Sequence, residues 1–80
     1  MKYYVMALEQ TLINGEYSEY APTVKQYNNF KSAETYFHVR LGELANSASH
    51  SYAKLEIINS VGGVIKHDTT GEYHDEDATE

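Results

Sequence analysis

Residues 12–17 read LINGEY and residues 61–65 read VGGVI, and these two stretches decide the fold. Asn-Gly and Gly-Gly supply the positive φ angles that a two-residue hairpin turn requires, because glycine has no Cβ atom to clash there. Apolar, β-prone residues flank both pairs, so each pair predicts a β-hairpin. For the second pair, residues 59–62 could also form a longer, bulged turn.

Between the two hairpins lies a segment with apolar residues at helical spacing. The apolar positions are Phe30 at the entry, then Ala33, Phe37, Leu41, Leu44 and Ala48. This pattern predicts an amphipathic helix, and either Asn29 or Ser32 can cap it by accepting a backbone N–H bond. The order hairpin, helix, hairpin predicts an α+β fold. It is a ββαββ domain with a four-stranded, mainly antiparallel sheet and one helix packed on one face.

The first hairpin joins a strand over residues 2–12 to a second strand that contains Pro22. A two-residue turn at Asn14-Gly15 places Leu12 opposite Tyr17. The same register, continued, places Val5 opposite Val24. Because proline cannot donate a ladder hydrogen bond, we expect the second strand at an edge of the sheet.

Period-two alternation predicts which face of the sheet the helix covers. The first strand is more apolar at its even positions, and the third strand, over about residues 50–59, at its odd positions. The side chains expected beneath the helix are Tyr4, Met6, Leu8, Ala53, Leu55 and Ile57. The opposite face then carries Tyr3, Val5, Tyr20, Val24, Tyr52 and Ile58, with Glu9, Lys54 and Glu56 among them. One helix cannot cover both faces, so the second face is expected to be open.

The composition is unusual in its eight tyrosines, with no tryptophan and no cysteine. Tyrosine is common in strands, which explains part of this number. An open aromatic face is typical of a contact surface, because tyrosine combines a large contact area with a hydroxyl group. The partner-binding residues we predict are Tyr3, Tyr20, Tyr52, Lys54 and Ile58 of that face, with Asp75, Glu76 and Asp77 of the acidic C-terminal end.

The formal net charge of −6 is concentrated at the C-terminal end. Up to Gly71 the chain has six Lys or Arg and seven Asp or Glu, whereas residues 72–80 have five acids and no base. We therefore expect a single domain over residues 1–73 and an acidic, mobile tail over residues 74–80. The nearly neutral body is unsuited to direct binding of nucleic acid, which requires clustered Lys and Arg.

Catalytic, cofactor and metal motifs are not recognisable in the sequence. His38 and His50 have no Ser, Cys or Asp at a spacing typical of a catalytic triad, and Gly62-Gly63 lacks the remainder of a phosphate-binding loop. His67-Asp68 and residues 74–77 offer metal ligands, but their spacing matches no known closed site. We expect no enzyme, no cofactor and no metal centre.

The sequence also indicates where the protein works. No run approaches the roughly 18 apolar residues of a membrane helix, and the first residues read as a strand, not as a signal peptide. The lack of cysteine fits a reducing compartment. We expect a cytoplasmic protein that does not bind membranes.

The chain resembles the small accessory proteins that bacteriophages and other mobile elements encode, including anti-CRISPR and other anti-defence inhibitors. The resemblance rests on a short, cysteine-free, acidic chain with hairpins at 14–15 and 59–65, a helix over 32–44 and an acidic end over 75–80. It implies a non-enzymatic protein that occupies the working surface of a host protein, often as a dimer.

Two other functions stay open at this point. One is a sequestering protein in which tyrosines hold a nucleotide-like base and Lys54, Lys66 or Arg40 hold its phosphates, although the scarcity of basic residues speaks against it. The other is a minor structural or assembly protein, which predicts higher-order self-association. Because 80 residues without disulfides bury a small core, a homodimer is also predicted.

Overall fold

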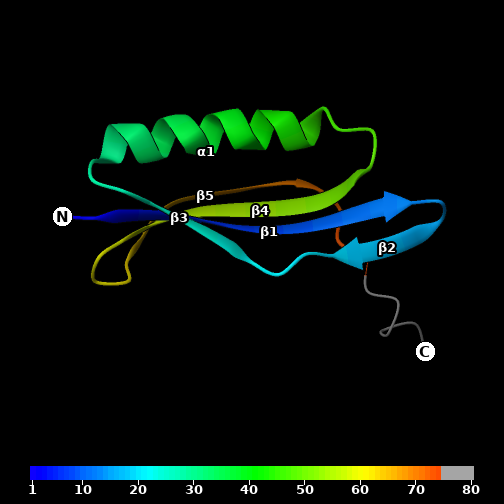
Figure 1. Cartoon of the computed structure of the whole chain (residues 1–80), viewed down its shortest axis with the longest axis horizontal. Helices are drawn as coiled ribbons and strands as arrows, with labels where there is room; N and C mark the ends of the chain where they lie inside the picture. The colour runs from blue at the N-terminus through cyan, green and yellow to red at the C-terminus, as the bar shows by residue number, and fades with distance from the viewer. Residues whose placement is uncertain (75–80) are drawn as a thin grey trace.

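Six elements follow one another along the chain, one strand more than the predicted ββαββ order (Figure 1). The computed structural model describes residues 1–74. Its elements are β1 (Tyr3–Ile13), β2 (Glu16–Glu19), β3 (Thr23–Tyr27), α1 (Phe30–Ala45), β4 (His50–Asn59) and β5 (Val64–Gly71). The predicted α+β fold is confirmed, since one helix packs on one antiparallel sheet.

The sheet has β1 and β4 at its centre and is antiparallel throughout. Strands β2 and β3 both pair with the same edge of β1, and β5 forms the opposite edge. Together β2 and β3 take the place of one strand, with a break at residues 20–22 that contains Pro22. The predicted edge position is confirmed, and the break explains why the four expected strands are divided into five.

The pairing of β1 with β3 differs from the predicted register by one residue. Leu12 lies opposite Tyr17 as expected, but Val24 pairs with Met6, so its predicted pairing with Val5 is wrong. Since Pro22 has no N–H to hold the ladder across the break, the register shifts there.

The two turns have different lengths. Ile13 pairs with Glu16, and Asn14 and Gly15 have φ angles of 54° and 80°, which confirms the two-residue turn. In the second hairpin, Asn59 N–H donates to the Gly63 carbonyl, and Asn59 Oδ1 accepts from Gly63 N–H at 2.9 Å. The second turn is therefore the longer alternative, and β5 continues as far as Gly71.

Helix α1 begins at the cap that the sequence offers. Asn29 Oδ1 accepts from Ser32 N–H at 2.8 Å, so Asn29 is the N-cap. The helix ends at Ala45, which leaves Ala48 outside it. Ala33, Phe37 and Leu44 are its buried residues.

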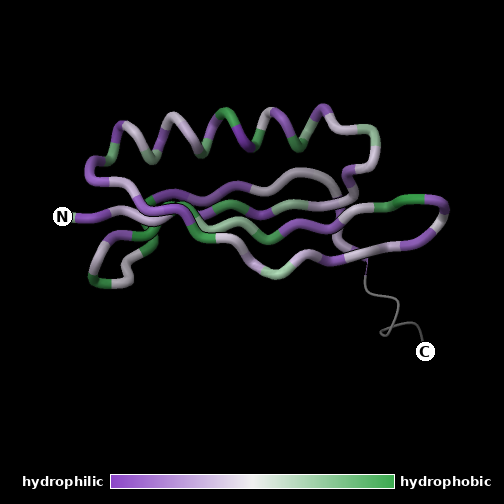
Figure 2. The backbone as a smooth tube through the Cα atoms, viewed as in Figure 1, coloured by the Kyte–Doolittle hydropathy of each residue, from purple (hydrophilic) through white to green (hydrophobic). Residues whose placement is uncertain are grey.

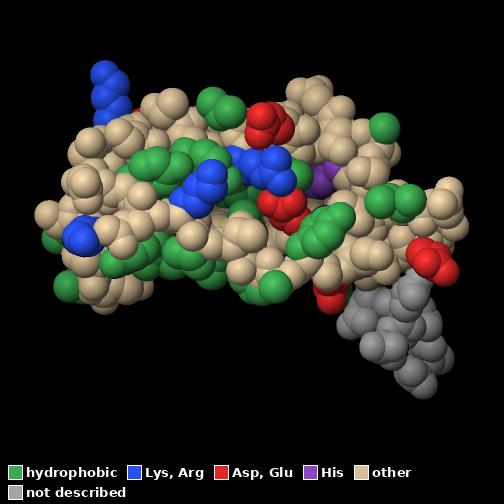
Figure 3. All heavy atoms as spheres, in the orientation of Figure 1, with side chains coloured by type: hydrophobic (Ala, Val, Ile, Leu, Met, Phe, Trp, Pro, Cys, Tyr) green, Lys and Arg blue, Asp and Glu red, His purple; other side chains and the backbone are tan. Residues whose placement is uncertain are grey.

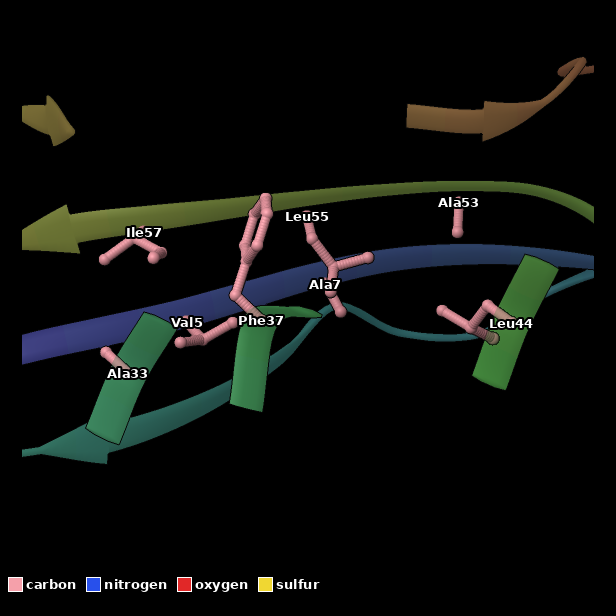
Figure 4. Packing of buried hydrophobic residues seen from close by; sticks show 8 residues of the cluster. All are labelled: Val5, Ala7, Ala33, Phe37, Leu44, Ala53, Leu55 and Ile57. Atoms are coloured by element: carbon pink, nitrogen blue, oxygen red, sulfur yellow. The ribbon is translucent and has the colours of Figure 1, made fainter. Parts of the chain in front are cut away.

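The core lies between α1 and the two central strands (Figure 4). Its buried members are Val5, Ala7, Ala33, Phe37, Leu44, Ala53, Leu55 and Ile57. Figure 4 shows the Phe37 ring in the middle of this cluster, beside Val5 and Leu55. The prediction for β4 is confirmed, because its three expected residues are all buried.

The predicted buried face of β1 is wrong. Val5 and Ala7 face the helix, whereas Tyr4, Met6 and Leu8 are half-buried on the other face. Small side chains on the strands allow a helix to approach the sheet closely, and the larger side chains of β1 would hold it away. Glu9 also made the odd face look polar, but this carboxylate has an arginine partner on α1.

Candidate functional site

The sheet face away from α1 is the first candidate site, and we call it the open face. It comprises Tyr4, Met6 and Leu8 of β1, Val24 of β3, and Tyr52, Lys54, Glu56 and Ile58 of β4. Among residues 1–74, α1 packs only on the opposite face (Figure 1). Figure 2 shows hydrophobic residues along the strands as well as along α1.

The centre of the open face is apolar, with one compensated pair of charges. Tyr4 pairs with Ile58 across the two central strands, and Met6 lies opposite Val24, which is 59% exposed. Beside them, Lys54 Nζ lies 3.7 Å from Glu56 Oε2. Because these charges neutralise each other, the face offers a partner mainly apolar and aromatic contact.

Tyrosines gather at one end of the open face around a small hollow. Its volume is about 250 Å³, and its lining includes Leu8, Gln10, Tyr20, Pro22, Tyr52 and Tyr73. The rings of Tyr52 and Tyr73 meet edge to face, with centroids 5.6 Å apart. A hollow below about 300 Å³ is smaller than a typical small-molecule site, so it suits one side chain of a protein partner better than a whole ligand.

Residues 72–74, which we call the C-terminal strap, close this end of the face. The side-chain amide of Gln10 binds both backbone groups of His74. Gln10 Nε2 donates to the His74 carbonyl at 2.6 Å, and the His74 N–H donates to Gln10 Oε1 at 3.0 Å. Ser51 Oγ donates to Gln10 Oε1 and to the Glu72 carbonyl. Gln10 is only 3% exposed, and these bonds satisfy its amide.

Two further contacts direct the strap. Gly71 has a φ of 79°, and a Cβ atom there would clash with the Ser51 carbonyl, so only glycine fits where the chain leaves β5. The His74 ring stacks on Tyr17 with centroids 4.7 Å apart. The last described residue, His74, is therefore held at the tyrosine-rich end of the open face.

The structure brings together some of the predicted partner-binding residues. Tyr52, Lys54 and Ile58 lie on the open face, and Tyr20 joins Tyr52 at the hollow. Tyr3 does not belong to this set: it packs against the core on the helix side, with its ring 5.7 Å from Phe30. Its predicted position on the open face is wrong, because β1 presents the opposite face to the helix.

Asp75, Glu76 and Asp77 lie outside the described residues. The sequence reasoning missed Tyr4, Met6 and Leu8 as open-face residues because it assigned them to the core. One signal could have corrected this. Glu9 lies on the same face of β1 as Val5 and Ala7, and it can form an ion pair with Arg40 of the helix. It also missed the strap, whose only local sign is Gln10, a polar residue between Leu8 and Leu12 at the even positions of β1.

A second hollow lies on the other side of the sheet, between α1 and the edge formed by β2 and β3 (Figure 3). Its volume is about 710 Å³, and Figure 3 shows basic side chains gathered on this side. Arg40 Nη2 donates to both Glu9 oxygens, at 3.0 and 3.1 Å, and Lys25 Nζ lies 4.6 Å from the Tyr36 ring centroid. Arg40 and Lys25, the two cations that line this hollow, therefore already have partners.

Two pKa values reflect this environment. Burial raises the pKa of Tyr27, and the nearby Tyr36 raises it further. Burial lowers the pKa of Arg40, but hydrogen bonds to Glu9 and the Glu9 charge outweigh it, and the pKa is raised overall. Arg40 thus stays charged and holds α1 to β1, which is a structural role.

Histidines and carboxylates do not gather elsewhere in the part of the chain that the structure describes. Within residues 1–74, no group of three or more metal-binding side chains is close enough to hold an ion. His38 Nε2 lies 3.2 Å from Lys66 Nζ, which also contacts Glu34 at 3.5 Å. Within these residues, the helix α1 is not long and apolar enough to cross a membrane.

Comparison of the chain with protein-family models, with curated proteins and with solved structures gives no match. The fold and the site define a small α+β domain with one helix on an antiparallel sheet.

Proposed function

We propose that this chain is a non-enzymatic protein-binding module that acts as a stoichiometric inhibitor of a host protein. The host protein would belong to a defence system or process nucleic acid, and the inhibitor would be of the kind that bacteriophages encode, at work in the cytoplasm of a bacterial cell. The observation that carries the proposal is the open face, an aromatic and apolar sheet surface opposite the helix-covered core.

The chemistry of the open face supports contact with a protein. Monomeric domains seldom expose contiguous apolar surface unless it is used, and aromatic residues dominate the energetics of protein interfaces. Tyr4, Tyr52 and Ile58 are half-buried on a rigid sheet, so little side-chain entropy is lost when a partner covers them. The hollow beside Tyr20 and Tyr52 adds a pocket for a single anchoring side chain.

The distribution of charge indicates what kind of partner fits. Residues 72–80 contain five acids and no base. The C-terminal strap holds their beginning, through His74, at the tyrosine-rich end of the open face. An apolar patch beside a basic surface on the partner would match this arrangement, and opposite charge would speed the encounter by electrostatic steering.

The sequestering alternative receives less support from the described contacts. The three cations that could hold its phosphates each lie close to a carboxylate: Arg40 to Glu9, Lys54 to Glu56, and Lys66 to Glu34. A ligand phosphate would have to compete with these carboxylates. An assembly role stays an alternative, and it predicts higher-order self-association without a foreign partner.

Affinity capture from a bacterial lysate, followed by mass spectrometry, tests the proposal. The bait is the full chain, compared with Met6→Glu at the centre of the open face and with Val39→Glu on the exposed side of α1. We expect wild type and V39E to retain the same host protein and M6E to lose it. Equal capture by all three baits, or capture of none, would count against the open face as the binding surface.

With the partner identified, the contribution of the tail can be measured separately. Removal of residues 75–80 leaves His74 and its bonds to Gln10 in place. We expect slower association and a weaker dependence on salt, with little change in dissociation, because long-range charge acts mainly on the encounter. Unchanged association kinetics across a salt series would remove the tail from the proposal.

A further inference from the structure

The two edges of the sheet differ in their capacity to accept another strand. The edge formed by β2 and β3 is interrupted at residues 20–22, whereas β5 is an edge strand of eight residues without proline. Its pairing with β4 has one bulge, at Ile65, and is regular from Lys66 to Gly71. A regular edge segment presents unpaired backbone groups and is a template for pairing with another chain. We propose that two copies of this protein form a symmetric dimer through antiparallel pairing of β5 with β5, centred on His67.

The direction of the backbone groups shows which residues of β5 are free to pair. Thr69 N–H donates to Asp68 Oδ1 at 2.8 Å, and His50 Nε2 of β4 lies 3.1 Å from the Thr70 carbonyl. In an antiparallel ladder the N–H and C=O of one residue point to the same side, and successive residues alternate. Thr70 is thus directed toward β4, and Thr69 and His67 are directed toward the free edge.

Charge then selects one register for the pairing. With the two-fold axis at His67, Lys66 of each copy lies directly opposite Asp68 of the other, on the same face of the sheet. Moving the axis by one residue would place Asp68 opposite Asp68, or Lys66 opposite Lys66, and like charges directly opposite are destabilising. The His67 register makes two opposite-charge pairs. It also brings together residues whose backbone N–H and C=O groups are directed toward the free edge in both copies.

The closest approach of side chains favours the same register. Residues that are opposite but not hydrogen-bonded have the shorter Cα separation in an antiparallel pair. Lys66 and Asp68 occupy such positions when His67 is the hydrogen-bonded centre. Each ammonium group would therefore come near a carboxylate of the second copy while it stays near Glu34 of its own α1.

Exposed apolar residues at the start of β5 would gain cover. Val64 is 51% exposed and Ile65 is 44% exposed. In the proposed register this end of β5 lies beside Thr69 and Thr70 of the second copy. In the single chain, Asp68 Oδ1 accepts from the Thr69 N–H, and pairing would offer this N–H a backbone carbonyl of the second copy instead.

The dimer goes beyond the proposed function and does not depend on it. A two-fold axis perpendicular to the sheet leaves both open faces uncovered on the same side of one continuous sheet. A dimer that used the open face would instead bury Met6 and Tyr52. The two arrangements can therefore be distinguished by where substitutions act.

Sedimentation equilibrium of the full chain over a concentration series is the primary test. Wild type is expected to dimerise, and Asp68→Lys should raise the dissociation constant by about tenfold, because two attractive pairs become repulsive. Lys66→Asp should do the same. An equimolar mixture of D68K and K66D should form a heterodimer, since each Lys again meets an Asp across the edge.

Two controls keep the result specific. Lys25→Asp makes the same charge change on the opposite edge strand and should leave dimerisation unchanged. Thr69→Pro removes an outward N–H without removing a bond to β4, and it should block the dimer while circular dichroism shows the native fold. Because Lys66 also packs near Phe37, the fold of K66D is checked in the same way.

The proposal is overturned by any of three results. These are a wild-type chain that stays monomeric at every concentration, a dimer that neither D68K nor T69P weakens, and a mixture of folded D68K and K66D that shows no heterodimer. Loss of dimer in Met6→Glu with retention in D68K would assign the contact to the open face instead.

Discussion

Both faces of the sheet carry apolar side chains, but these differ in size between the two faces. Beneath α1, Ala7 and Ala53 lie next to Val5, Leu55 and Ile57, and all are buried. The open face carries larger residues, among them Tyr4, Met6, Leu8 and Tyr52, and these remain half-buried. Apolar side chains occur on both faces of β1, so the alternation along the strand does not show which face the helix covers.

In this sheet, the size of the side chains explains which face α1 covers. A close approach requires alanines at the contact, and here α1 contributes a third one, Ala33. One large ring, Phe37, then fills the space between the layers. The larger side chains on the open face can cover one another partly, but they have no second layer to complete their burial.

The largest effect is expected for Phe37→Ala. Phe37 is fully buried in the centre of the core, and its truncation should lower the free energy of unfolding by about 3–5 kcal/mol. Met6→Ala, on the open face, should cost about 1 kcal/mol. Urea denaturation followed by circular dichroism measures both, and equal costs would mean that the two faces are equally buried.

A medium effect is expected where the helix contacts an alanine. Ala53→Leu should destabilise the fold by about 1–3 kcal/mol, because the added atoms push α1 away from β4. The neighbouring Lys54→Leu places the same side chain on the open face and should change stability by no more than about 0.5 kcal/mol. If A53L were as stable as K54L, close packing would not explain the choice of face.

The smallest effect is expected from the ion pairs, one on each face. Glu9 is 13% exposed and binds Arg40 through two oxygens, so a double-mutant cycle with Glu9→Gln and Arg40→Met should give a coupling of about 1 kcal/mol. The more exposed Lys54 pair with Glu56 should give less than about 0.5 kcal/mol. A reversed order would contradict the assignment of Glu9 to the helix-covered side.

Local sequence signals predicted the elements well. The Asn14-Gly15 turn, the Asn29 cap and the position of β4 all follow from backbone preferences within a few residues. These preferences act wherever the segment is placed. The structure confirms the turn and β4, and it selects Asn29 over the alternative cap Ser32. The edge position of the second strand follows equally directly from Pro22.

The candidate site could be predicted only in part. Tyr52, Lys54 and Ile58 were placed on the open face because β4 alternates cleanly. Tyr3 was misplaced because the face of β1 depends on its fit to α1. The bond between Gln10 and His74 joins residues 64 positions apart, and no local pattern predicts such a contact.

The alternation of hairpin, helix and hairpin and the two-residue first turn follow from the chain alone, since short-range φ and ψ preferences act before any packing. Which side of β1 is buried, how the register shifts at Pro22, and where the C-terminal strap is held depend on packing. These choices require a set separation of two layers and partners far along the chain, and neither exists until the helix has docked on the sheet.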